Sequence, residues 1–207
     1  MEGGRINKIV ITGGPCAGKS SIISMLKDNY GDEIITVPEA ATLLLAGGFP
    51  MPGKHLDWCD RWQHAFQKSV LHLQKSLEET YALMAERKNV KLLVCDNGLP
   101  SGAAYMPGGI AEFIAMYGID LEKELSDYSS VIHLETIALS QPEKYGRHNN
   151  ESRYTTLEEA IKHDNLIKEI WFKHPQRLVL SSWQSLEDKY CLVKKLVDGY
   201  LVTINQI

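Results

Sequence analysis

Apolar and polar positions along the chain form two alternating patterns. Short runs rich in Val, Ile and Leu predict buried strands, at 6–12, 33–37, 91–95, 131–134 and 177–180. Between them, apolar residues recur every three or four positions, which predicts helices near 18–29, 40–46, 57–88, 111–117, 156–172 and 185–201. Strands that alternate with helices predict an α/β fold, with a parallel sheet of about five strands and helices on both faces.

The ends of the predicted strands indicate where chemistry is expected. In parallel sheets, ligands bind beyond the carboxyl ends of the strands. Those ends lead into the loop that begins at Gly13 and into Glu39, Asp96, Glu135 and Ser181. We therefore expect the functional residues among these positions.

The loop after the first strand matches the phosphate-binding motif G-x-x-x-x-G-K-[ST] without a gap. Its residues are Gly13, Gly14, Pro15, Cys16, Ala17, Gly18, Lys19 and Ser20, followed by Ser21. Glycines let the backbone wrap nucleotide phosphates, and the following helix adds positive partial charge at its N-terminus. We expect ATP, or GTP, with Lys19 on the β- and γ-phosphates and the Ser20 hydroxyl on Mg²⁺. A glycine-rich turn that binds nothing is the alternative, and the placement between strand and helix disfavours it.

Two carboxylates at predicted strand ends are candidates for the chemistry. Asp96 stands where a P-loop protein is expected to carry an acid that organises Mg²⁺, or else it is a turn residue. Glu39 follows Val37 and Pro38 at the rim of the same crevice. It would accept a proton from a substrate hydroxyl or bind that substrate, unless it only caps the next helix.

Composition narrows the class of protein. The 207 residues suit one domain, 1–207, and a net charge of -4 gives no overall attraction to nucleic acid or anionic membranes. The four cysteines are widely spaced, which favours a reducing compartment, and no apolar run is long enough to insert into a membrane. We expect a cytoplasmic protein. The histidines show no spacing typical of a transition-metal site, and the oligomeric state is not determined by the sequence.

Four segments follow the phosphate loop along the chain: VPEAA (37–41), CDNGLPSGAAY (95–105), NNESRYTTLEEA (149–160) and HDNLIKEIWFKHP (163–175). Together with GGPCAGKS (13–20), they resemble the P-loop ATPases related to the ribosylnicotinamide-kinase domain. The resemblance covers almost the whole chain. It implies an ATP-dependent small-molecule kinase or ATPase.

The chain is also similar, more distantly, to the deoxynucleoside kinases. In that family a Pro-Glu pair after the second strand supplies the general base, and an acid-Arg pair follows the third strand. Glu39 and Asp96 occupy the two acidic positions, whereas Asn97 replaces the arginine and removes one cation that would stabilise the transition state. A lid at about 140–155, which holds Lys144, Arg147 and Arg153, is a substitute source, and the resemblance favours Arg153; solvated loop charge is the alternative.

The predicted long helix carries a polar line beside its apolar stripe. Gln63, Gln67, Gln74 and Glu78 are spaced by four, seven and four positions. They either face one pocket for a small acceptor or form a solvated helix face. Trp183, after the last strand, is a candidate contact for adenine.

Two functions remain open from the sequence. The first is a kinase-like enzyme that transfers the γ-phosphoryl group of ATP to a nucleoside-like or other small hydroxylated acceptor, with Lys19, Glu39, Asp96 and Arg153 as its catalytic residues. The second is an ATP- or GTP-binding switch or adaptor with weak hydrolysis that engages a protein or a lipid headgroup. The loss of arginine at Asn97 favours the second function, whereas Glu39 and the polar line favour the first.

Overall fold

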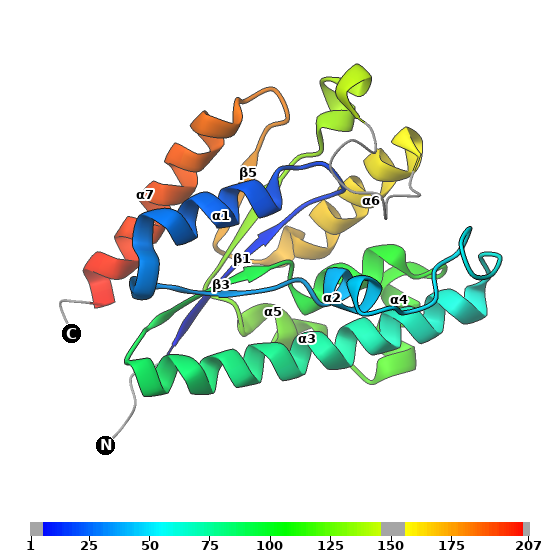
Figure 1. The fold of residues 1–207 in the computed structure, drawn as a ribbon, viewed down its shortest axis with the longest axis horizontal. Coiled ribbons are helices and arrows are strands. Elements are labelled where there is room, and N and C mark those ends of the chain that lie inside the picture. The colour runs from blue at the N-terminus through cyan, green and yellow to red at the C-terminus, as the bar shows by residue number, and fades with distance from the viewer. Residues whose placement is uncertain (1–5, 146–155, 205–207) are drawn as a thin grey trace.

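The computed structural model describes residues 6–145 and 156–204. Five parallel strands form one sheet in the order β2-β3-β1-β4-β5 (Figure 1). The strands are β1 Asn7–Thr12, β2 Ile35–Val37, β3 Leu92–Asp96, β4 Ser130–Leu134 and β5 Arg177–Leu180. This arrangement confirms the predicted α/β fold class with its five-stranded parallel sheet.

Helices connect the strands. The α-helices are α1 Lys19–Tyr30, α2 Ala40–Ala46, α3 Asp60–Lys88, α4 Gly109–Tyr117, α5 Leu121–Ser126, α6 Leu157–Ile170 and α7 Leu186–Ile204. Short 3-10 helices lie at η1 Gly31–Glu33, η2 Leu99–Tyr105, η3 Ile137–Leu139, η4 Pro142–Lys144 and η6 Trp171–Lys173. Within the described part of the chain, no helix is both long and apolar enough to cross a membrane.

The sheet lies between two helical layers. Ile9 and Ile11 of β1 pack with α1 and α7 on one face, where Val193 and Val197 are fully buried. Val10, the alternate residue, packs on the other face with α3, α5 and α6 (Figure 1). Because strand side chains alternate between faces, continuous apolar strands bury residues in both layers.

The strand order brings three loops together. β3 and β4 lie on either side of β1, so the chain crosses over in opposite directions from the central strand. The carboxyl ends of the three strands therefore meet at one edge of the sheet, where such folds bind ligands.

Three details differ from the sequence predictions. Glu33 belongs to η1, so β2 begins only at Ile35. Asp57 is not the N-cap of the long helix, because the chain is still extended at Cys59 and α3 begins at Asp60. The pattern also missed η2, which packs against α3, α4 and α6, and α5, which packs against η2.

Candidate functional site

The phosphate loop joins β1 to α1 through strained backbone that suits its sequence. Gly13 has φ 140, and a Cβ there would lie 2.1 Å from the Leu134 carbonyl oxygen. Gly18 has φ 92 and Cys16 has φ 59, so both adopt left-handed conformations. The Lys19 Nζ atom donates to the carbonyls of Gly13 (2.9 Å) and Gly14 (3.1 Å) and thus lies over the loop.

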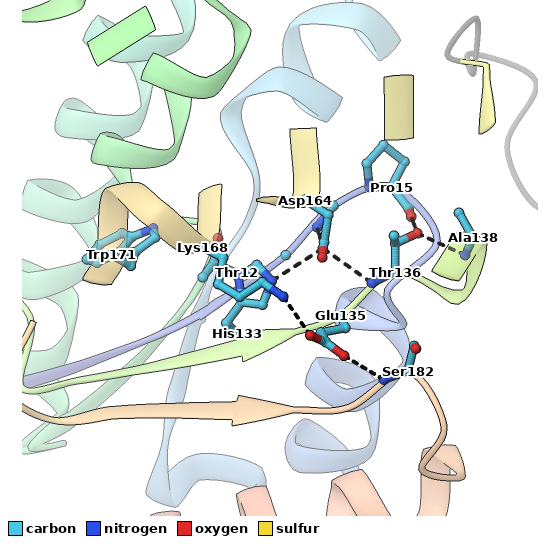
Figure 2. A network of polar contacts seen from close by, with 12 residues as sticks. Thr12, Pro15, His133, Glu135, Thr136, Ala138, Asp164, Lys168, Trp171 and Ser182 are labelled. Carbon is cyan, nitrogen blue, oxygen red and sulfur yellow. Dashed lines mark hydrogen bonds and ion pairs between the residues drawn. The ribbon is translucent and has the colours of Figure 1, made fainter. Parts of the chain in front are cut away.

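Asp164 of α6 is hydrogen-bonded to the backbone of the phosphate loop. Its carboxylate is fully buried, and Oδ1 accepts the backbone N–H groups of Gly14 (2.7 Å) and Thr136 (3.2 Å) (Figure 2). A Cβ on Gly14 would come within 2.8 Å of Asp164 Cβ. The Thr136 hydroxyl donates to the Pro15 carbonyl. Asp164 therefore ties the phosphate loop to the end of β4, a contact that the sequence analysis missed because the partners are 150 residues apart.

Replacing Asp164 with alanine is expected to lower the free energy of unfolding by about 3 kcal/mol, because two buried amides lose their acceptor at about 1–3 kcal/mol each. Chemical denaturation measures the change. Asn165→Ala, an exposed neighbour on α6, is the matched control and should stay within about 0.5 kcal/mol of wild type. Equal stability of the two variants would contradict the role of Asp164.

His133, buried within β4, faces the same carboxylate. Its Nε2 atom lies 3.3 Å from Asp164 Oδ1, and the residue is fully buried. Neither ring nitrogen of His133 has a hydrogen-bond partner among the described residues, so the expectation of a hydrogen-bonded core histidine is wrong, and the approach to Asp164 is a contact without hydrogen-bond geometry. The described residues hold no group of three His, Cys, Asp or Glu side chains that could bind a metal ion by themselves.

Glu135 and Ser181, both selected as strand-end candidates, have structural partners. Glu135 accepts from Lys168 Nζ (2.6 Å) and from the Ser182 backbone N–H (3.2 Å) (Figure 2). Although burial opposes it, the hydrogen bond from Lys168 lowers the pKa of Glu135. The Ser181 backbone N–H donates to Gln184 Oε1 at 2.8 Å. These contacts fix the turn between β5 and α7 rather than face the phosphate loop.

Glu39 and Asp96 lie on adjacent strand ends beside Lys19. Burial and the neighbouring Glu39 raise the pKa of Asp96 to about 7, while Lys19 opposes the rise. Asp96 Oδ1 is buried and has no hydrogen-bond partner among the described residues. Glu39 occupies the N-cap position of α2, yet its side chain makes no capping bond to the backbone. The capping alternative therefore does not account for the Glu39 carboxylate.

Asp96→Asn is expected to stabilise the protein at pH 8 in the absence of Mg²⁺. The folded-state pKa of about 7 exceeds the ordinary 3.8, so the folded protein keeps a proton that the unfolded chain has lost. Stability therefore falls as pH rises from about 4 to about 7, by an amount on the order of 4 kcal/mol at most. The asparagine variant lacks that loss. Urea denaturation at pH 5 and pH 8 measures it.

The matched control for this prediction is Asp28→Asn, which changes an exposed acid on α1. The difference between wild type and Asp96→Asn should be small at pH 5 and largest at pH 8. A wild type that is at least as stable as Asp96→Asn at both pH values would contradict the burial of an ionised Asp96.

A cavity of about 240 Å³ opens beside Glu39 and Asn97. Its walls come from α2, from α3, and from the segment that runs from the end of β3 through η2. Three members of the polar line, Gln63, Gln67 and Gln74, line it and are at most 8% exposed. The solvated-face alternative for these glutamines is therefore wrong.

The rest of the cavity wall is aromatic and aliphatic. The rings of Trp62 and Phe66 stack at 5.0 Å, and Phe113 closes the far side. Burial raises the pKa of Tyr105, which keeps its lining hydroxyl protonated and able to donate. Gln67 Oε1 is buried without a partner among the described residues. The cavity combines flat apolar walls with a few amide and hydroxyl groups.

Glu78, the fourth member of the polar line, lies behind the cavity. It accepts from Lys8 Nζ (3.0 Å), from the Tyr128 hydroxyl (2.8 Å) and from Gln74 Nε2 (3.1 Å). Gln74 Oε1 in turn accepts from the Ala40 backbone N–H (3.2 Å). Glu78 therefore holds Gln74 and the start of α2 in place rather than reaching a ligand.

Other predicted residues lie at the edge of the site. Arg147 and Arg153 fall outside the described residues, as does most of the predicted lid, and Lys144 is exposed on η4. Trp183 is 76% exposed in the β5–α7 turn, next to Ser182, whose carbonyl accepts from Ser140. Ser20 and Ser21 lie in the first turn of α1 and are exposed.

A phosphate loop at the switch point of a five-stranded parallel sheet defines a P-loop nucleotide-binding domain. Comparison with family models shows that residues 8–189 match a family described as AAA domain. The match spans most of the sequence, so the chain belongs to this family.

Known structures and sequences add limited information. The chain is similar in fold to deoxyadenosine kinase from M. mycoides with bound dATP, with a TM-score of 0.61 and 16% sequence identity. The similarity covers 93% of this chain and 99% of that one. No curated protein sequence matches the chain. This similarity shows that the two proteins share the P-loop fold, while the closer likeness to the ribosylnicotinamide-kinase domain stays a prediction.

Proposed function

We propose that this protein is an ATP-dependent kinase of small hydroxylated molecules that carry no negative charge, with nucleoside-like compounds as the leading class. The observation that carries the proposal is the cavity lined by glutamines and aromatic rings that opens directly beside Glu39, with only β3 between β2, which leads to Glu39, and β1, which leads to the phosphate loop. A protein that only bound or hydrolysed ATP would have no use for a second pocket at this place.

The phosphate loop is assigned to the nucleotide. Residues 13–21 wrap the triphosphate, and Lys19 exchanges its bonds to the loop carbonyls for bonds to the β- and γ-phosphates. The buried, unpartnered Oδ1 of Asp96 and the hydroxyl of Ser20 fit Mg²⁺, a cation that prefers oxygen ligands and keeps part of its water shell. When bound, Mg²⁺ neutralises phosphate charge, and Arg153 is assigned to the same task.

Glu39 is assigned as the general base. It lines the cavity, and its carboxylate is held by Thr42 (2.5 Å) and Asn97 (3.3 Å) instead of being paired with a cation. An unpaired carboxylate at this point can accept the proton of an acceptor hydroxyl as the oxygen attacks the γ-phosphorus. The proton then resides on Glu39 and the phosphoryl group on the acceptor.

The charge of the cavity restricts the acceptor. None of the residues that line it in the described part of the chain is Lys, Arg or His, and Glu39 supplies a negative charge. An anionic acceptor such as a nucleoside monophosphate would find no counter-charge there. The stacked rings of Trp62 and Phe66 suit a planar group, and Gln63 and Gln67 suit its hydrogen-bonding edge.

The test is acceptor-stimulated ADP release. Purified protein with ATP and Mg²⁺ is assayed against nucleosides, their monophosphates, ribosylnicotinamide and simple polyols, with Lys19→Ala as the blank. The proposal expects stimulation by at least one uncharged or cationic compound with an aromatic base and none by the matched monophosphate. GTP in place of ATP tests the choice of nucleotide.

The competing function is the ATP- or GTP-binding switch or adaptor, which the missing arginine at Asn97 favours. A panel without stimulation, despite tight nucleotide binding, would overturn the kinase proposal and leave the switch. Stimulation by monophosphates alone would overturn the inferred charge of the acceptor.

A further inference from the structure

Asn97 is the residue at which the sequence departs from the deoxynucleoside kinases, and its surroundings give it a defined orientation. It follows β3 directly, with φ 65, and its backbone N–H donates to the Ile11 carbonyl at 2.9 Å. This conformation, which asparagine adopts more readily than most residues, turns the side chain between Thr12 and Glu39. Asn97 Oδ1 accepts from the Thr12 hydroxyl at 2.8 Å, and Nδ2 donates to Glu39 Oε1 at 3.3 Å.

The two ends of an asparagine amide have nearly the same shape but opposite hydrogen-bonding character. If the amide were flipped, Oδ1 would face the Glu39 carboxylate, and two acceptors would repel each other. The Thr12 hydroxyl decides the matter only if its hydrogen points toward Asn97. A partner that directs this hydroxyl hydrogen toward Asn97 would reinforce the orientation set by Glu39.

Trp171 supplies the fixed direction. Its indole Nε1–H can only donate, and it donates to Ser101 Oγ at 2.9 Å. Ser101 Oγ lies 3.0 Å from Thr12 Oγ1. When Ser101 donates to Thr12 and Thr12 donates to Asn97, both hydroxyl hydrogens take part in one series of hydrogen bonds. Since Trp171 and Thr12 are fully buried and Ser101 is 1% exposed, water is not at hand to reorient them.

We propose that this series of hydrogen bonds, from Trp171 through Ser101 and Thr12, makes Asn97 a positioning residue for Glu39. The ordered hydrogens hold the Asn97 amide with Nδ2 toward Glu39, so that a neutral donor orients the carboxylate without adding positive charge to the cavity. The role rests on Glu39 acting as the proposed base. The geometry spans elements far apart in sequence, because Thr12 lies in β1, Ser101 in η2 and Trp171 in η6.

The first test is kinetic. Thr12→Val keeps the shape of the side chain and removes its hydroxyl. Ser101→Ala removes the hydroxyl that precedes Thr12 in the series of hydrogen bonds. Each is expected to lower acceptor-dependent kcat about tenfold, the equivalent of one lost hydrogen bond, while the Kd for ATP stays unchanged. Thr12→Ser restores the hydroxyl and should recover most of the rate.

Ser130→Ala is the matched control. Ser130 also carries a buried hydroxyl on a strand, but its Oγ lies 2.7 Å from the Tyr200 hydroxyl and takes no part in the hydrogen bonds that lead to Asn97. Its kcat should equal that of wild type. Equal rates for Ser130→Ala, Thr12→Val and Ser101→Ala, or a loss of rate in Thr12→Ser as large as in Thr12→Val, would overturn the positioning role.

The second test does not need turnover. Nitrogen-15 NMR follows the side-chain NH₂ of Asn97, assigned by its loss in Asn97→Asp. In the wild-type background, Glu39→Gln should shift this signal, and in the Thr12→Val background, where the amide is held less firmly, the same change should shift it less. An Asn97 signal that does not shift on Glu39→Gln in the wild-type background would overturn the positioning role. A shift without any acceptor-dependent activity would leave the positioning intact and overturn the kinase proposal instead.

Discussion

Glu39→Gln is expected to lower acceptor-dependent phosphoryl transfer by about 10²–10⁴-fold, the range for loss of a general base, while ATP binding persists. Glutamine has the size of glutamate and remains able to accept a hydrogen bond, so the cavity and the start of α2 should keep their shape. What it cannot do near neutral pH is take up the proton of the acceptor hydroxyl. Steady-state kinetics with the acceptor found in the panel, together with calorimetric titration of ATP, separate the two effects.

Glu33→Gln is the matched control for this prediction, because it changes an exposed glutamate of η1, shortly before β2. It should behave as wild type. Transfer that survives in Glu39→Gln would limit Glu39 to shaping the cavity. Loss of ATP binding together with transfer would show that the variant had disturbed the phosphate loop.

Lys19→Ala is expected to weaken nucleotide binding about a hundredfold or more. The ammonium group would make charge-assisted bonds to two phosphates, and losing roughly 3 kcal/mol corresponds to that factor. The fold should be unaffected, because among the described residues the Nζ atom is hydrogen-bonded only to the carbonyls of Gly13 and Gly14. Fluorescence titration with a labelled ATP analogue measures affinity, and thermal unfolding without nucleotide measures stability.

Lys27→Ala, an exposed lysine in the last turn of the same helix, serves as the control and should leave affinity unchanged. Equal affinity of Lys19→Ala and wild type would refute the phosphate-binding role of the loop. A large fall in melting temperature for Lys19→Ala alone would instead indicate a structural role for the lysine.

The local motifs could be predicted from the sequence because the interactions that form them join residues close together in the chain. The phosphate loop needs glycines at Gly13 and Gly18 for backbone that other residues avoid, and these positions are only five residues apart in the chain. The capping box of α6 joins Thr156 to Glu159, three residues apart, and the predicted helix start at Thr156 is confirmed as its N-cap. Apolar runs likewise marked all five strands, since burial on both faces demands them.

Helix faces were less readable. The predicted apolar stripe of α3 includes Met84, which is 36% exposed, whereas Gln67 and Gln74 are almost completely buried. The spacing of glutamines in the sequence is the same whether their side chains face water or line a cavity. What buried these amides was the packing of α2, η2 and α4 against α3, which depends on contacts between distant segments.

The α/β fold class, the phosphate loop and the placement of Glu39 and Asp96 at strand ends could be predicted from the sequence, because each follows from residue types and their spacing along the chain. The contact of Asp164 with Gly14, the cavity lined by three glutamines, and the hydrogen bonds that lead from Trp171 through Ser101 and Thr12 to Asn97 required the tertiary structure. The last of these contacts joins side chains 70 and more residues apart. Their partners are chosen by the order of strands in the sheet and by the helices laid across it, which no local pattern contains.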